Sequence, residues 1–188
     1  MKRVVITGLG IVSCIGNDAE TVTKNLKNLN SGISSAPEYE EFSFRSLVHG
    51  KPDINLEENI DRRLLRFMGD GAAFNYIAMK NAIEDSGLEE KDVSNEMTGI
   101  IVGSGGPSTM NLYKAADLGR NSGSKKVGPF MVPRSMSSTN SATISPFWKT
   151  PPVSLMFIIL SNISIGGEGN CALPLPNKSP LAQSISCS

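Results

Sequence analysis

The stretch that decides the fold is Thr98-Gly99-Ile100-Ile101-Val102-Gly103-Ser104-Gly105-Gly106-Pro107. Its β-branched apolar run predicts a buried strand, and the glycines and proline that follow predict a tight turn. A similar run near the start of the chain, Val4-Val5-Ile6, leads into Thr7-Gly8-Leu9-Gly10. The sequence therefore predicts two buried strands, at residues 4–6 and 98–102.

Two helices are predicted between these strands. The first begins at a cap supplied by Asn17 or Asp18 and stops at Asn30-Ser31-Gly32. The second carries apolar residues from Leu64 to Ile83, over more than one face, and closes at Ser86-Gly87. The order strand, helix, helix, strand predicts an α/β fold.

The remaining segments are less regular. The irregular pattern of residues 34–58 predicts a long surface loop with at most short strands around residues 42–48. Residues 112–118 predict a helix, and Ser137-Ser138-Thr139-Asn140 predicts the start of another. Residues 150–188 contain only two charged side chains and little periodicity, so we expect a separate tail without a defined core.

The composition excludes several classes of protein. The 18 basic and 18 acidic residues balance, which leaves no overall field to attract nucleic acid or an anionic membrane. The three cysteines show no paired spacing, which favours a reduced, cytoplasmic protein. The longest apolar run, at residues 153–160, is too short to span a bilayer, and the N-terminus has no signal-peptide core.

The sequence Gly8-Leu9-Gly10 after a predicted strand invites comparison with dinucleotide-binding loops. The third glycine position holds Ser13, and no strand ending in an acidic residue follows at the required spacing. We favour a structural turn, and nucleotide binding by an α/β domain stays a weaker alternative.

A basic cluster, Arg62, Arg63 and Arg66, opens the second predicted helix, where positive charge opposes the helix dipole. Such clusters are usually solvated faces, but the unfavourable placement suggests that an acidic protein or a phosphate binds there. Lys125 and Lys126 could extend this patch.

Four other features have ordinary interpretations. Gly103-Ser104-Gly105-Gly106 follows a strand, where α/β proteins often bind ligands, but its glycines could serve only a turn. His49 is expected to be a surface or packing residue, Cys14 a buried small apolar residue, and Met131 and Met136 core or interface fillers. We expect no metal site and no cofactor.

Five separated blocks, taken together, resemble the β-ketoacyl-acyl-carrier-protein synthase I family over residues 1–149. They are residues 1–13 (Met-Lys-Arg-Val-Val-Ile-Thr-Gly-Leu-Gly-Ile-Val-Ser), Ile60-Asp61-Arg62-Arg63 with Arg66-Phe67-Met68, Gly103-Ser104-Gly105-Gly106, Val127-Gly128-Pro129-Phe130, and Met136-Ser137-Ser138. The resemblance implies an α/β, thiolase-like fold of α-β-α-β-α layers, of which this chain holds an incomplete first half. It also implies a homodimer in the full-length family.

The resemblance implies an acyltransferase that extends fatty acids by decarboxylative condensation of an acyl thioester with malonyl-carrier protein. Arg62, Arg63, Arg66 and Lys125 then form the docking patch for the acidic acyl carrier protein. By the same resemblance, Gly106 and Met136 look like parts of the acyl pocket, which Met136 would reach across the dimer interface.

The chain departs from the family pattern after Lys149. Ser161 stands where the family has its nucleophilic cysteine, and the catalytic lysine and both histidines belong to the family's second half. The late Ser184-Ile185-Ser186-Cys187-Ser188 lacks the helix that would activate a thiol. We therefore expect a partial synthase domain at residues 1–149, a non-family tail at 150–188, no catalytic residue and no activity by this chain alone. A non-catalytic carrier-protein-binding module is the alternative.

Overall fold

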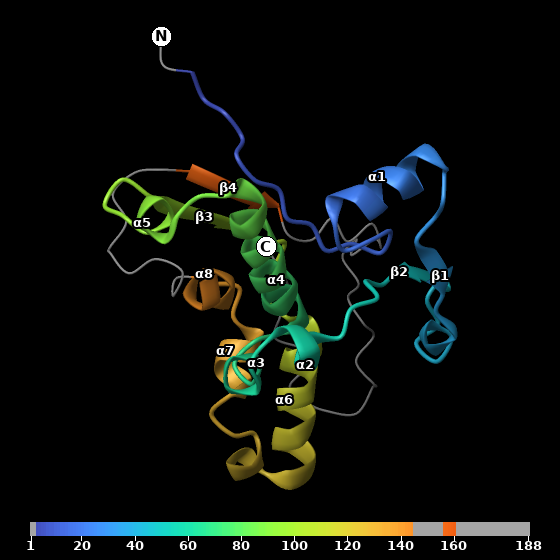
Figure 1. The fold of residues 1–188 in the computed structure, drawn as a ribbon. Coiled ribbons are helices and arrows are strands. Elements are labelled where there is room, and N and C mark those ends of the chain that lie inside the picture. Colours follow the sequence, from blue (N-terminus) through green and yellow to red (C-terminus); the bar gives the residue numbers. More distant parts are fainter. Residues whose placement is uncertain (1–2, 145–155, 161–188) are drawn as a thin grey trace, which may run out of the picture.

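The computed structural model describes residues 3–144 and 156–160 (Figure 1). Two small sheets lie on opposite sides of the helix α4 (Asp70–Ser86). Strands β1 (Ile33–Ser35) and β2 (Val48–Gly50) pair antiparallel, and β3 (Gly99–Gly103) pairs in parallel with β4 (Met156–Leu160). The α/β class predicted from the sequence is confirmed.

Helix α4 lies at the centre because both of its sides are covered by apolar contacts. One cluster packs Ala72, Ala73 and Ile77 against Ile60 and Met68. A second cluster joins Met79 to Val93, Ile144 and the inner side chains of β3. Full burial of a side chain such as Met79 contributes about 1.5–3 kcal/mol, so these two clusters fix the position of α4.

The apolar pattern from Leu64 to Ile83 predicts one helix, but the structure divides it into α3 (Arg62–Leu65) and α4. The break lies at Gly69, whose backbone is extended and whose missing side chain leaves room for another segment. A Cβ atom at Gly69 would lie 2.8 Å from the carbonyl oxygen of Arg134. The end of α4 is as predicted, because Gly87 adopts the left-handed conformation with φ of 63°.

The predicted strand at residues 4–6 is wrong. Val4, Val5 and Ile6 are exposed and pair with no strand in the described part of the chain. The segment after them instead runs along α4, where a Cβ atom on Gly8 would lie 2.1 Å from the carbonyl oxygen of Ala82. High β propensity does not form a strand without a partner to complete its hydrogen bonds.

A buried polar contact joins α4 to α8 (Thr139–Ile144). The Nδ2 of Asn75 donates to the Oδ1 of Asn140 over 2.6 Å, and both residues are buried. Asn140 Nδ2 also donates to the carbonyl oxygen of Ser137, which ties the amide to the start of α8. Buried polar groups are tolerated when they are paired, so this bond favours one packing of α8 on α4.

The other elements are short helices at the periphery. Helix α1 (Ala19–Lys27) has the predicted cap at Asp18, and the predicted helix at residues 112–118 is part of the longer α6 (Thr109–Ser122). The remaining helices are α2 (Leu56–Asn59), α5 (Glu90–Val93), α7 (Met131–Ser135), and the 3-10 turns η1 (Pro37–Tyr39) and η2 (Ser124–Lys126). None of the helices in the described ranges is long and apolar enough to cross a bilayer.

Two predictions about strands need correction. Strand β3 is present, but it is only partly buried, and the side chain of Ile101 is 47% exposed because the only strand described beside β3 is β4. Strand β4 falls in the segment 150–188, for which no regular structure was expected. Its sequence Met-Phe-Ile-Ile-Leu consists of apolar residues and includes types favoured in strands. The domain boundary at residue 149 stays a prediction.

Candidate functional site

The predicted basic cluster lies on one exposed helical turn. Asp61 caps α3 by accepting the N–H of Arg63 over 2.6 Å, and the N–H of Arg66 donates to the carbonyl oxygen of Arg62, one turn earlier. Arg62 and Arg66 are therefore one turn apart, as the spacing predicts. Together with Asp61 the three arginines line an open hollow of about 450 Å³.

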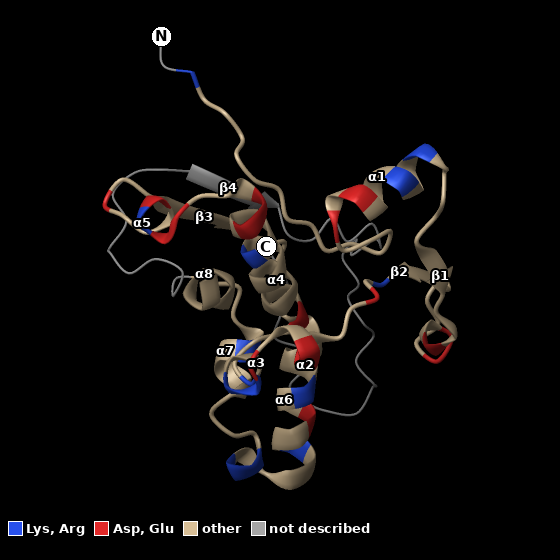
Figure 2. Cartoon of the chain, viewed as in Figure 1, with Lys and Arg blue, Asp and Glu red and all other residues tan. Residues whose placement is uncertain are grey.

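Asp61 is the one acidic residue that lines this hollow, and no ion pair to the three arginines is found within the described residues. The ion pairs found there join Glu38, Glu84 and Glu89 to other bases, none of them in the cluster. A guanidinium carries five N–H donors arranged to bind a carboxylate or a phosphate at two points. Three exposed arginines around one hollow thus have the chemistry to bind an anion. Figure 2 shows basic residues in blue beside α3 and α7.

Arg66 is held by residues that the sequence interpretation did not assign to a site. Its Cζ atom lies 5.0 Å from the ring centroid of Phe67 and 5.0 Å from that of Phe130. The two rings stack edge to face at 5.1 Å. The Nε of Arg134, on α7, donates to the carbonyl oxygen of Arg66 over 2.8 Å. In the sequence, the only indication of this arrangement is that Phe67 and Phe130 stand in the blocks that resemble the synthase family.

Lys125 and Lys126 form a second basic group. They lie in η2, which Figure 2 shows apart from α3 and α7, toward the far end of α6. Both lysines are exposed. Helix α6 contacts both η2 and α7 and so connects the two basic groups. A partner that contacts both would have to extend along α6.

The two predicted acyl-pocket residues lie in neighbouring segments. Gly106 is in the loop after β3, and Met136 is the exposed residue that ends α7. The N–H of Ser108 donates to the carbonyl oxygen of Ser135 over 3.1 Å, which joins these segments. A Cβ atom on Gly106 would meet nothing within 4 Å, so the loop is open on that side. Helix α7 thus links this loop to the arginine cluster through Arg134.

The nucleotide-binding alternative for Gly8-Leu9-Gly10 is not supported by the geometry. A Cβ atom on Gly10 would lie 1.7 Å from the carbonyl oxygen of Ala78, so the space that the glycine opens is filled by α4. The N–H of Leu9 donates to Asp85 Oδ2 over 2.9 Å. These glycines allow backbone packing on a helix, and they leave no room there for a pyrophosphate.

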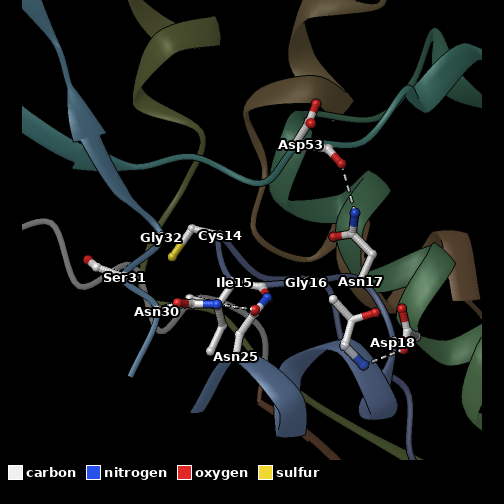
Figure 3. A pocket seen from close by; sticks show the side chains of 11 residues that line it. Cys14, Ile15, Gly16, Asn17, Asp18, Asn25, Asn30, Ser31, Gly32 and Asp53 are labelled. Carbon is white, nitrogen blue, oxygen red and sulfur yellow. Dashed lines mark hydrogen bonds between the residues drawn. The ribbon is translucent and has the colours of Figure 1, made fainter. Parts of the chain in front are cut away.

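A second hollow, of about 360 Å³, lies beside the turn at residues 13–18 (Figure 3). Its polar side chains mostly bind the chain itself: Asn17 Nδ2 donates to the carbonyl oxygen of Asp53 and Asn25 Nδ2 to that of Ile15. Cys14 is half-buried there, which agrees only in part with the buried residue expected. We therefore interpret this hollow as a structural gap beside the turn and α1, bridged by these hydrogen bonds.

The capping position of Asp18 lowers the pKa of its carboxyl. Hydrogen bonds from Thr21, chiefly its backbone N–H at 2.7 Å, hold the pKa of the Asp18 carboxyl below its ordinary value. A carboxyl with a lowered folded-state pKa stabilises the protein above its unfolded pKa of about 3.9, and this contribution is lost as the pH falls through the folded-state value.

We therefore expect Asp18→Asn to remove a pH-dependent part of the stability. Asparagine still caps the helix but does not titrate. The difference in free energy of unfolding between wild type and variant should be constant from about pH 7 to 5 and should shrink as the pH falls below about 4. Urea denaturation at several pH values measures it. A difference in the free energy of unfolding that does not change with pH would contradict a lowered pKa of Asp18.

His49 lies in β2, where its ring stacks edge to face on Tyr39 and its Nδ1 is 3.7 Å from Glu38 Oε1. This is a packing position of the kind predicted. Within residues 3–144 and 156–160 no group of His, Cys, Asp and Glu is arranged to hold a metal ion. Ser161, Cys171 and the Ser184–Ser188 segment lie outside the described residues.

The arrangement of helices and strands defines the fold. It matches a β-ketoacyl synthase from Burkholderia phymatum with a TM-score of 0.69 and 23% identity, covering 82% of this chain and 39% of that one. A type II PKS ketosynthase in complex with its acyl-carrier protein matches with a TM-score of 0.62 and 22% identity, over 81% of this chain and 41% of that one. The fold is therefore that of the thiolase-like ketosynthases.

The sequence comparisons give the family. Residues 1–155 match the family model for the β-ketoacyl synthase N-terminal domain, so the chain belongs to this family. It is 46% identical over 150 residues to 3-oxoacyl-(acyl-carrier-protein) synthase 1 of Haemophilus influenzae, covering 79% of this chain. The corresponding enzyme of Escherichia coli K12 is 41% identical over 150 residues, covering 78% of this chain. The chain spans 37% of the length of each of these relatives.

Proposed function

We propose that this chain supplies the carrier-protein docking surface and part of the acyl pocket of a β-ketoacyl-acyl-carrier-protein synthase. The observation that carries the proposal is the exposed turn of Arg62, Arg63 and Arg66, whose guanidinium groups form no ion pair in the described part of the chain. Unpaired arginines attract an acidic protein over a distance set by the ionic strength and favour fast, salt-dependent association. An acyl carrier protein is a strongly acidic partner of this kind.

The chemistry of the complete enzyme would require the docking surface and the acyl pocket to lie close together. A cysteine thiolate takes the acyl group from the carrier thioester, malonyl-carrier protein loses carbon dioxide, and the resulting carbanion attacks the acyl thioester. The new carbon–carbon bond extends the chain by two carbons as the thiolate leaves. Helix α7 touches the arginine cluster at Arg134 and the pocket loop at Ser135, which supports delivery of the acyl group along this helix.

The described residues supply surfaces for this reaction and none of its catalytic groups. We therefore propose that the chain alone does not condense acyl and malonyl thioesters, and that the family activity requires the nucleophile, lysine and histidines of a full-length synthase. Half-exposed Met136 supports the proposal that the pocket is completed in a homodimer. A cytoplasmic location fits a partner that acts in fatty acid synthesis.

Titration of fluorescently labelled acyl carrier protein with the purified chain tests the docking proposal. We expect saturable binding in about 50 mM salt that weakens strongly in about 300 mM salt, because the contacts are exposed ion pairs. No binding at low salt would contradict the proposal. Product formation from acyl- and malonyl-carrier protein would contradict the absence of activity.

A further inference from the structure

The side chain of Arg66 lies in a notch between two aromatic rings. The Cζ–centroid distances to Phe67 and Phe130 are both 5.0 Å, and the ring centroids are 5.1 Å apart, so the three groups form a nearly equilateral triangle. A cation within about 6 Å of a ring centroid is attracted by the negative face of the ring. Arg66 is therefore held in place from two sides before any partner binds.

The two rings come from segments far apart in the sequence. Phe67 directly follows Arg66, whereas Phe130 precedes α7 and is 37% exposed. The same junction is fixed by the bond from Arg134 Nε to the carbonyl oxygen of Arg66. Packing on aromatic rings still leaves a guanidinium with N–H donors free at its edge, where a carboxylate or phosphate binds.

We propose that Phe130, together with Phe67, is a positioning residue that holds the Arg66 guanidinium ready to bind an acidic group of the carrier protein. The inference rests on the proposed docking function. An exposed arginine side chain that can rotate freely loses rotamer freedom when it binds a partner, and this loss of entropy reduces the affinity. The aromatic notch removes much of that cost in advance, so the rings act on the affinity through Arg66.

The first experiment compares carrier-protein affinity across Phe130 variants. We expect Phe130→Leu to weaken binding by about three- to tenfold, the effect of releasing one long side chain, and Phe130→Trp to restore wild-type affinity. Phe42→Leu is the matched control, since Phe42 is exposed and its ring contacts Phe44, in the segment between η1 and β2. Equal thermal melting of the variants shows that they are folded. Unchanged affinity in Phe130→Leu would overturn the proposal.

A double-mutant cycle separates positioning from direct contact. In an Arg66→Gln background, Phe130→Leu should have almost no further effect, because its influence passes through Arg66. A full additional loss would show that Phe130 touches the carrier protein itself and would overturn the proposal.

A spectroscopic readout keeps the inference testable if the carrier protein does not bind. The NMR resonances of the Arg66 side chain should be displaced by the ring currents of the two phenyl groups and should move toward ordinary values in Phe130→Leu. Undisplaced resonances in the wild type would overturn the positioning role. If only the proposed docking function is wrong, the Arg66 resonances should be displaced although the carrier protein does not bind.

Discussion

Replacing Arg62, Arg63 and Arg66 together by glutamate should abolish binding of acyl carrier protein. Each substitution removes an attractive contact and places a negative charge against an acidic partner, which is more damaging than neutralisation. The combined loss should exceed about 100-fold in Kd, equivalent to about 2.7 kcal/mol. Fluorescence titration at low salt measures it. Any residual binding should no longer weaken as salt is raised, because the attractive ion pairs are gone and salt screens the new repulsion.

The control for this charge reversal is Lys24→Glu with Lys27→Glu on α1, which changes the net charge without touching α3. This variant should bind nearly as well as the wild type, since it alters only the overall charge. If the arginine and lysine variants lose equal affinity, the interaction is a non-specific response to net charge and the docking surface is rejected.

Replacing Gly10 by alanine should cause the largest loss of stability among substitutions of the described glycines. The new Cβ atom would lie 1.7 Å from the carbonyl oxygen of Ala78 and 2.7 Å from its carbonyl carbon. The helix holds both atoms in place, so the N-terminal segment must move away from α4. We expect a loss of about 3 kcal/mol in the free energy of unfolding, the upper part of the range for overpacking, measured by urea denaturation.

Gly105→Ala is the matched control for this substitution. A Cβ atom there meets nothing within 4 Å, and its φ lies outside the left-handed region. Its effect should stay within about 0.5 kcal/mol of zero, as for most surface changes. If Gly10→Ala were equally harmless, the segment at residues 8–10 would not pack on α4 as described.

The features predicted best from the sequence are those set by neighbouring residues. Asp18 caps a helix by accepting the N–H of Thr21, three residues later, and Gly87 ends one through its own left-handed backbone. The break at Gly69 could not be predicted, because the apolar pattern continues through it and the break makes room for the carbonyl oxygen of Arg134. The strand predicted for Val4-Val5-Ile6 was wrong because strand propensity is a local property and does not depend on whether a partner strand is available.

The candidate site shows the same division. The arginines of α3 were predicted because their charge and one-turn spacing are local properties. Phe130 and Arg134 were not, because only the folding of α7 onto α3 brings them to Arg66. Gly106 and Met136 came from family resemblance, and their assignment to an acyl pocket remains a prediction. The structure adds that one hydrogen bond joins their segments.

The two sheets should form at different stages of folding. Strands β1 and β2 are joined by residues 36–47 and can meet early, because closing a short loop loses little chain entropy. Strands β3 and β4 are separated by residues 104–155, which include α6, α7 and α8. Parallel pairing across so long a connection belongs to the slow, non-local contacts that govern folding rates. The loop that holds Gly106 starts directly after β3, so it should reach its final geometry only in the last steps of folding.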